Sequence, residues 1–241
     1  MRTSRQFPLR TRTTAEPEPD LVPVVVIHRA IREDVRRLDA CLRAAARDGP
    51  ASSRADAIRR YTSALLAQVL GHLDSEDEIL WRVIAAAAGQ SVDLAPLTDD
   101  HHGIEAAAGE VTLALAAVTA APGGLRKLSA SVTPLRELLD EHIADEEAQV
   151  FPAMRRYLTA GACLWSGKQI WRSAGFRDRA FAVPWLARYA KRGELRRLLA
   201  PGGWSAWLWL AAGRPGYARL ERQAFGPPPA RNAASSRQVR G

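Results

Sequence analysis

EHIADEEAQVFP occupies residues 141–152, and the related stretch GHLDSEDEILW occupies residues 71–81. Each stretch places a glutamate four residues after a histidine, and the two pairs are His72 with Glu76 and His142 with Glu146. Four residues are about one turn of an α-helix, so the two side chains of each pair point the same way. Each stretch, if helical, therefore offers one nitrogen and one oxygen to the same interior point.

Apolar residues around these stretches recur every three or four positions, which predicts four long helices. The expected ranges are 24–48, 53–88, 94 to the stop at Pro122, and 128–158. Short loops between them imply antiparallel neighbours. The fold class expected is therefore all-α, with an up-down-up-down four-helix bundle.

Composition divides the chain into four parts. Six of the seven tryptophans follow Gly161, among many arginines, which predicts a short helical extension with helices at 163–174, 178–200 and 203–211. Both ends hold little that can be buried and are expected to be disordered. The expected parts are a disordered tail at 1–22, the bundle at 23–160, the Trp/Arg-rich extension at 161–225 and a disordered tail at 226–241.

The formal net charge of +8 hides a strong polarity along the chain. Residues 14–154 hold 13 Lys and Arg against 23 Asp and Glu, whereas residues 155–241 hold 17 against 3. An acidic body with basic ends does not indicate a nucleic-acid-binding protein, and no module of that class is recognisable. Neither a signal peptide nor an apolar run long enough to span a bilayer is visible, so we expect a cytoplasmic location.

Four of the five histidines fall in the apolar stripe of a different expected helix, namely His28, His72, His101 and His142. A single histidine on an apolar face is usually a core residue with satisfied hydrogen bonds. That interpretation weakens when every helix carries one. Two of the stripes also carry a carboxylate, Glu76 and Glu146, and a buried carboxylate is costly unless it is paired or bound to a metal.

Four imidazoles and two carboxylates, shared between two metal ions, give each ion about two histidines and one carboxylate. That set is typical of non-haem Fe(II) sites with open coordination positions. Closed zinc sites favour four ligands and often cysteine. A ferritin-like site needs a glutamate three residues before each histidine, and those positions are Val25, Val69, Thr98 and Leu139. The sequence therefore favours a di-iron site of another kind.

The order His28, His72-x-x-x-Glu76, His101 and His142-x-x-x-Glu146, with EE-x-x-V-F-P closing the second pair, resembles the hemerythrin HHE cation-binding family. The resemblance covers residues 24 to about 158. It implies a four-helix bundle around two non-haem irons, with these six residues as metal ligands.

Two positions depart from the family pattern. Glu105 stands where oxygen-carrying members have a second histidine one turn after the third-helix ligand, and it is either a ligand or a neighbour of the ligands, or else a solvated acid. A carboxylate there would favour ferric iron and would argue against reversible O₂ carriage. His102 adjoins His101, which leaves either as the third-helix ligand, with His101 favoured and His102 a candidate donor to the ligands. The remaining nearby acids are expected on a solvated face, with orientation of ligand imidazoles as the alternative for some of them; they are Asp74, Asp77, Glu78, Asp145 and Glu147.

The function expected first is a bacterial di-iron protein that binds or reacts with O₂, hydrogen peroxide or NO, in oxidative-stress response or iron handling. Catalase-like breakdown of peroxide stays open, and any catalysis would belong to the metal. The alternative is a metal-responsive regulatory or structural helical module. In that case residues 161–225, which otherwise pack against the bundle, would contact an acidic protein or a membrane surface.

Overall fold

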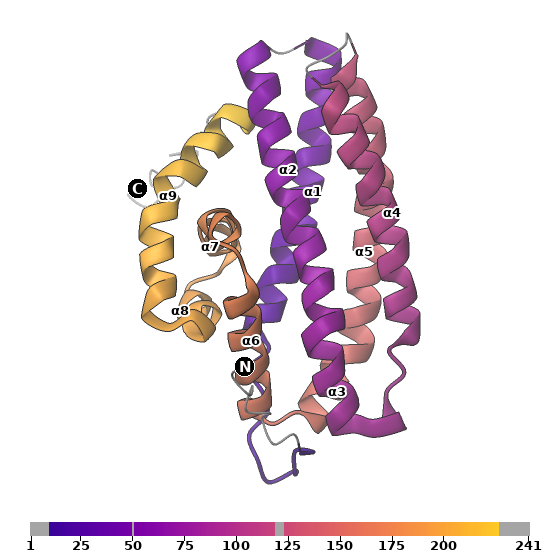
Figure 1. Cartoon of the computed structure of the whole chain (residues 1–241), viewed down its shortest axis with the longest axis vertical. Coiled ribbons are helices and arrows are strands. Elements are labelled where there is room, and N and C mark those ends of the chain that lie inside the picture. The colour runs from indigo at the N-terminus through magenta and orange to yellow at the C-terminus, as the bar shows by residue number, and fades with distance from the viewer. Residues whose placement is uncertain (1–9, 50, 119–122, 227–241) are drawn as a thin grey trace, which may run out of the picture.

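Long helical rods lie side by side along the long axis of the molecule (Figure 1). The computed structural model describes residues 10–49, 51–118 and 123–226, and within these ranges there is no strand. The rods are α1 (Val22–Asp48), the composite of α2 (Ser52–Ser75), η1 (Glu76–Leu80) and α3 (Trp81–Ala88), α4 (Ala95–Ala117) and α5 (Gly124–Tyr157), with the short turn η2 (Gly89–Ser91) before α4. Their ranges match the four helices expected from the sequence to within a few residues.

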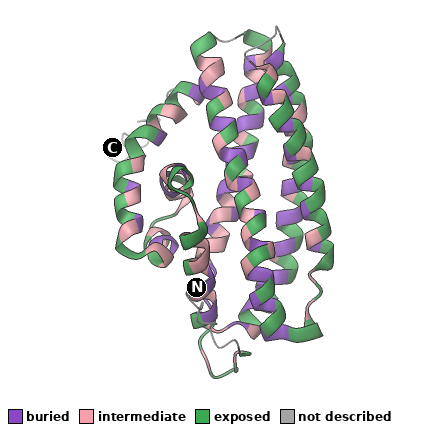
Figure 2. Cartoon of the chain, in the orientation of Figure 1, coloured by how far each residue is buried: buried purple, intermediate pink, exposed green. Residues whose placement is uncertain are grey.

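Local chemistry accounts for the ends of the rods. Pro23 and Pro96, the second residues of α1 and α4, lack the N–H group that the first turn of a helix leaves unpaired. Gly49 ends α1 in the left-handed conformation, with φ of 63°, and its N–H bonds to the carbonyl of Ala45. Figure 2 shows the buried residues on the facing sides of the rods and the exposed residues outside, which is the pattern that the apolar stripes predict.

The chain after Tyr157 forms a second layer along one flank of the rods (Figure 1). It contains α6 (Ala160–Ser173), α7 (Phe176–Tyr189), α8 (Glu194–Leu199), η3 (Ala200–Gly202) and α9 (Gly203–Phe225). Helices α7 and α9 contact α2, whereas α7 and α8 contact α1. Phe181, Trp185 and Tyr217 join the same apolar cluster as the interior of the rods. The extension therefore packs against the rods and shares their core.

Two helix boundaries in the extension differ from the sequence predictions. The helix expected at 178–200 is interrupted after Tyr189, and Gly193 adopts a left-handed φ of 92° before α8 begins. The helix expected at 203–211 continues to Phe225, through Gly213 and Pro215. A Cβ atom at Gly213 would lie 2.6 Å from the carbonyl oxygen of Ala180, so this glycine permits the close crossing of α9 over α7.

The expected disordered tail at 1–22 is wrong for its described part. The hydroxyl of Thr11 donates to the carbonyl of Ala87 at 2.6 Å, and the N–H of Arg12 donates to the carbonyl of Tyr157 at 2.8 Å. Leu21 is buried. These contacts hold residues 10–21 against the end of the rods. Residues 1–9 and 227–241 lie outside the described residues. No helix of the described ranges is both long and apolar enough to cross a bilayer.

A buried carboxylate joins the extension to the rods. Asp34 on α1 accepts hydrogen bonds from the hydroxyl of Tyr61 at 2.6 Å, the hydroxyl of Tyr189 at 2.6 Å and the indole N–H of Trp185 at 2.9 Å. The Tyr217 hydroxyl on α9 lies 3.1 Å from that of Tyr61. Burial raises the pKa of Asp34 above its ordinary value, against the opposing effect of these donors. Helices α1, α2, α7 and α9 thus meet at one polar network inside an apolar core.

Replacing Asp34 should weaken the packing of the extension against the rods and lower the free energy of unfolding. Asp34→Ala leaves three buried donors without their acceptor, and each such group costs about 1–3 kcal/mol. We expect a loss of about 3–5 kcal/mol in the free energy of unfolding. Urea unfolding of the full chain, followed by circular dichroism, measures it. Glu33→Ala, an exposed acid on the same helix, is the control and should change stability by less than about 0.5 kcal/mol. Equal midpoints for the two variants would refute the role of Asp34.

Candidate metal centre

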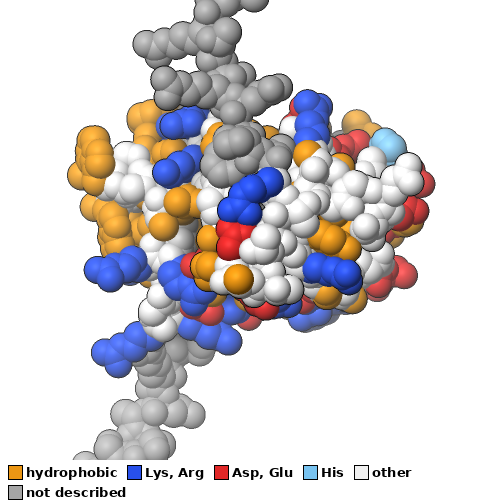
Figure 3. Space-filling model, turned by 90° about the horizontal axis from the view of Figure 1, so that it is seen from below, with side chains coloured by type: hydrophobic (Ala, Val, Ile, Leu, Met, Phe, Trp, Pro, Cys, Tyr) orange, Lys and Arg blue, Asp and Glu red, His pale blue; other side chains and the backbone are white. Residues whose placement is uncertain are grey.

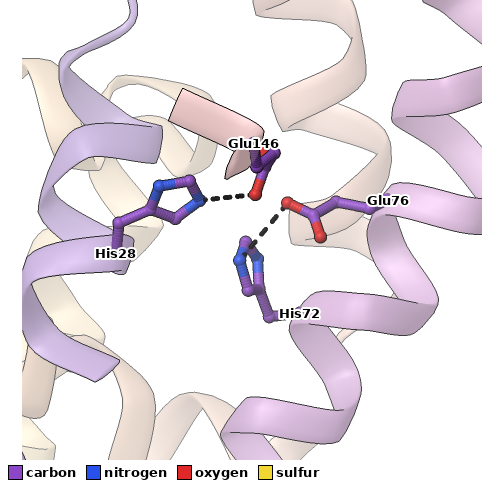
Figure 4. Close-up of side chains that lie close together, drawn as sticks. All are labelled: His28, His72, Glu76 and Glu146. Atoms are coloured by element: carbon purple, nitrogen blue, oxygen red, sulfur yellow. Dashed lines mark ion pairs between the residues drawn. The ribbon is translucent and has the colours of Figure 1, made fainter. Parts of the chain in front are cut away.

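Six side chains from all four rods converge in the interior. His28 comes from α1, His72 from α2, Glu76 from η1, His101 from α4, and His142 and Glu146 from α5. Their ligand atoms form two groups, and within each group the atoms lie within 4.8 Å of one another; the groups are His28, His72, Glu76 and Glu146, and Glu76, His101 and His142. Figure 4 shows the first group, with two imidazoles and two carboxylates pointing toward a common centre.

Each carboxylate lies between a histidine of one group and a histidine of the other. For Glu76, Oε1 lies 3.3 Å from Nε2 of His72, and Oε2 lies 3.7 Å from Nε2 of His101. For Glu146, Oε2 lies 3.1 Å from Nε2 of His28 and 4.0 Å from Nε2 of His142. This is an arrangement in which two carboxylates can be shared between two neighbouring cations.

The atoms that face the centre have no protein hydrogen-bond partner. They are Nε2 of the four histidines and both carboxylate oxygens of Glu76 and Glu146. A buried polar atom left unpaired costs about 1–3 kcal/mol, so most such atoms in folded proteins are paired. Lone pairs of nitrogen and oxygen that converge on one point are satisfied by a cation. The described residues therefore fit a metal site of mixed imidazole and carboxylate ligands.

Two acids outside the cluster orient its imidazoles. Nδ1 of His28 donates to Oε1 of Glu147 at 3.0 Å, and Nδ1 of His101 donates to Oδ2 of Asp77 at 2.9 Å. Arg32 in turn contacts the second oxygen of Glu147 at 3.3 Å. A proton held at Nδ1 leaves Nε2 with a free lone pair facing the centre, which is the form that binds a metal.

Asp77 and Glu147 thus take the second of the two roles that the sequence left open for these acids, since they orient imidazoles rather than lie on a solvated face. The signal available in the sequence was their position, since each directly follows a glutamate of the cluster. The other acids of that set, Asp74, Glu78 and Asp145, are exposed as expected. Neighbouring acids in one motif therefore have three different environments: some are buried in the cluster, some accept a hydrogen bond from an imidazole, and some are exposed to solvent.

The pKa shifts of the two central carboxylates go in opposite directions. Burial raises the pKa of Glu76 well above its ordinary value, and the nearby Glu146 carboxylate adds to the rise. Burial also acts to raise the pKa of Glu146, but its contact with His28 outweighs that effect and lowers the pKa. The two acids therefore repel each other across a low-dielectric centre, and positive charge between them relieves that repulsion.

The histidines divide in the same way. Burial and the neighbouring His28 lower the pKa of His72 to about 3, and burial and His101 lower the pKa of His142. Both imidazoles are therefore neutral near pH 7. For His28, burial lowers the pKa, but the Glu146 and Glu147 carboxylates outweigh it and raise the pKa. The site combines neutral imidazoles with an attraction for positive charge, and both favour metal binding.

Two predicted residues of α4 do not join the cluster. His102 and Glu105 are exposed and belong to neither group of ligand atoms. The buried line of α4 passes through Leu97, His101 and Ile104, and positions 102 and 105 each fall one residue beyond it. His101 is therefore the α4 histidine at the centre. Glu105 is exposed, which agrees with the solvated-acid alternative that the sequence left open for it.

A π-helical turn lies at the site, which the sequence did not reveal. In η1 the N–H of Trp81 bonds to the carbonyl of Glu76, five residues earlier, and such turns occur often at functional sites. The Trp81 ring stacks on His101 with centroids 6.2 Å apart, and the Phe151 ring stacks on His28 at 5.5 Å. Both aromatic residues are buried, so they form apolar walls on two sides of the ligand atoms.

Comparison with known proteins agrees with this geometry. A model of the family described as hemerythrin HHE cation binding domain matches residues 24–160, which is more than half of the chain. The search of curated proteins and the search of solved structures gave no significant match. The matched segment begins within α1, ends at the start of α6 and contains all six residues of the cluster. The chain therefore belongs to the hemerythrin HHE cation-binding family.

Proposed function

We propose that this protein is a non-haem di-iron protein that binds or reacts with a small oxidant, namely O₂, hydrogen peroxide or NO. In this proposal residues 23–160 form an up-down-up-down four-helix bundle, and residues 161–225 form an extension on its flank. The observation that carries the proposal is the pair of carboxylates between two groups of histidines, whose inward atoms have no hydrogen-bond partner among the described residues. The family match supports metal binding at these residues.

The two groups suggest how the ligands would divide. His28 and His72 would hold one iron, His101 and His142 the other, and Glu76 and Glu146 would be shared. Bound iron supplies redox chemistry and open coordination positions for an exogenous ligand. The chain itself orients the imidazoles through Asp77 and Glu147 and excludes water with apolar walls. The same proposal includes a cytoplasmic location, where the free thiols of Cys41 and Cys163 would stay reduced.

Reaction with a small oxidant, or sensing of it, is favoured over reversible O₂ carriage, but for a different reason from the one that the sequence suggested. Because Glu105 is exposed, the argument that it makes the site more anionic no longer applies. Helix α4 contributes one histidine to the centre, where oxygen-carrying members of the family have two. The second iron would therefore have fewer nitrogen donors and a position that a small ligand can take. Breakdown of peroxide is one activity that such a site can support, and the spectrum below tests for it.

Iron loading tests the proposal directly. Full-length protein loaded anaerobically with Fe(II) should retain about two irons per chain and show absorption bands that change when peroxide is added. His72→Ala combined with His142→Ala removes one donor from each group, and retention should fall below about one iron per chain. His102→Ala, an exposed histidine beside the cluster, should retain as much iron as the native chain. Native protein that holds no iron, or a double variant that holds as much as the control, would refute the di-iron assignment.

Glu147 offers a finer test, because it acts through His28. Glu147→Gln weakens the acceptor for Nδ1 of His28 and should lower iron affinity about 10–100-fold, as other changes behind metal ligands do. Asp145→Asn makes the same acid-to-amide change at an exposed position two residues away and should leave affinity unchanged. Competition with a chelator of known affinity measures both variants. Equal affinities would mean that the Glu147 contact does not position the ring.

A metal-responsive regulator is the second candidate, and the path of α1 favours it. This helix carries His28 in the cluster and, six residues later, Asp34 in the network that holds the extension. A change at the centre can therefore reach residues 161–225 through one rigid helix. Limited proteolysis should cut the extension at different rates in iron-loaded and chelator-treated protein. Identical digestion patterns would mean that iron binding does not change the exposure of the extension, and would contradict this second candidate.

A further inference from the structure

Helix α9 presents large apolar side chains to solvent. Trp204 is 77% exposed, Trp207 47% and Leu208 58%. Their spacing of three and four residues places them on one face, opposite the buried face that contains Ala206 and Leu210. Single exposed apolar residues are ordinary on protein surfaces, but a contiguous group of this kind marks an interaction site.

The exposed group extends beyond α9. Phe176 at the start of α7 is 74% exposed, and its ring packs edge-on against Trp209 with centroids 4.6 Å apart. Phe176, Trp204, Trp207 and Leu208 are called the α9 patch below. Figure 3 shows hydrophobic side chains gathered at the edge of the molecule that α9 occupies, with Lys and Arg side chains beside them.

The charge around the α9 patch has one sign. Residues 160–226 contain 12 Lys and Arg against 3 Asp and Glu. All three acids are engaged within the described chain: Arg29 pairs with Glu194, Arg37 and Arg188 pair with Glu221, and Asp178 accepts from the N–H of Gly175. Arg188 and Arg197 of the extension are paired, with Glu221 and Asp20, but the basic side chains still outnumber the acids, so the surface attracts an anionic partner.

Some of these basic side chains lie on the same surface as the α9 patch. On α9, Arg219 and Arg222 follow Trp204 and Leu208 on the same helical face, and both are exposed. Within the described residues neither takes part in an ion pair with a carboxylate. At the other end of the patch, Arg177 adjoins Phe176 and is also exposed. Apolar and basic side chains thus share one surface, rather than lying on separate faces.

We infer that the α9 patch docks this protein on an anionic phospholipid surface. Tryptophan and phenylalanine with flanking arginines are the side chains that place a helix flat in the headgroup region, with its apolar face in the acyl boundary. Each nearby Lys or Arg adds attraction to the anionic leaflet. The docked helix lies in the plane of the surface, in keeping with the finding that no described helix can cross a bilayer. This inference does not depend on which ion occupies the interior.

Vesicle flotation of the full-length chain tests the inference. The protein should float with vesicles that contain phosphatidylglycerol and should bind pure phosphatidylcholine far less, and binding should weaken as salt is raised. Trp204→Ala, Trp207→Ala and Leu208→Ala together remove most of the exposed apolar area and should weaken binding by about tenfold or more. Leu113→Ala, a 69% exposed apolar residue on α4, is the matched control and should bind like the native chain.

Two further measurements keep the outcome decisive. If circular dichroism shows that the triple variant is misfolded, Arg219→Glu with Arg222→Glu replaces it and should weaken binding to the anionic vesicles by a similar factor. Brominated lipids should quench the tryptophan fluorescence of the bound native protein. Native binding that is absent, equal on both lipids or unchanged in the variants overturns the inference. So does lipid-independent self-association that the triple variant abolishes, because the patch would then serve a second copy of the chain.

Discussion

Glu76 and Glu146 are carboxylates held in an apolar interior, and a carboxylate in that environment needs a positive partner. Their neighbours are imidazoles, of which His72 and His142 are neutral near pH 7, while the pKa of His28 is raised by Glu146 and Glu147. The four rods nevertheless pack around this pair. The burial of these two carboxylates is therefore the most specific physical feature of the chain. The ligand geometry, the outer acids and the aromatic walls follow from it.

Much of this centre could be predicted from the sequence, since helical spacing is regular. Residues four apart share a face, so His72 with Glu76 and His142 with Glu146 had to point the same way once the segments were helical. The positions that spacing alone could not decide lie at the edges of the stripes. Glu105 and Asp77 are both acids near a predicted ligand, yet one is exposed and the other supports His101. Whether each acid is exposed or contacts an imidazole depends on which neighbouring rod faces it, and a single sequence does not give that information directly.

The extension was harder to predict for a related reason. Gly213 and Pro215 suggest a helix end when read locally, but α9 continues past both, and the close crossing with α7 accounts for the glycine at position 213. Asp34 directly precedes Val35 of the apolar stripe, and its local sequence does not distinguish it from a solvated acid. Its partners, Trp185 and Tyr189, lie more than 150 residues away in the chain. Such a network can be recognised only when the partner helices are in place.

That same network bears on where this protein can be divided. The family match ends at residue 160, yet the core of the matched segment is completed by Phe181, Trp185 and Tyr217 from beyond it. A recombinant fragment cut at the family boundary would expose the apolar flank of α1 and α2 and leave Asp34 with only Tyr61 among its three donors. The limit of the recognisable homology and the limit of the cooperative folding unit are therefore different places in this chain.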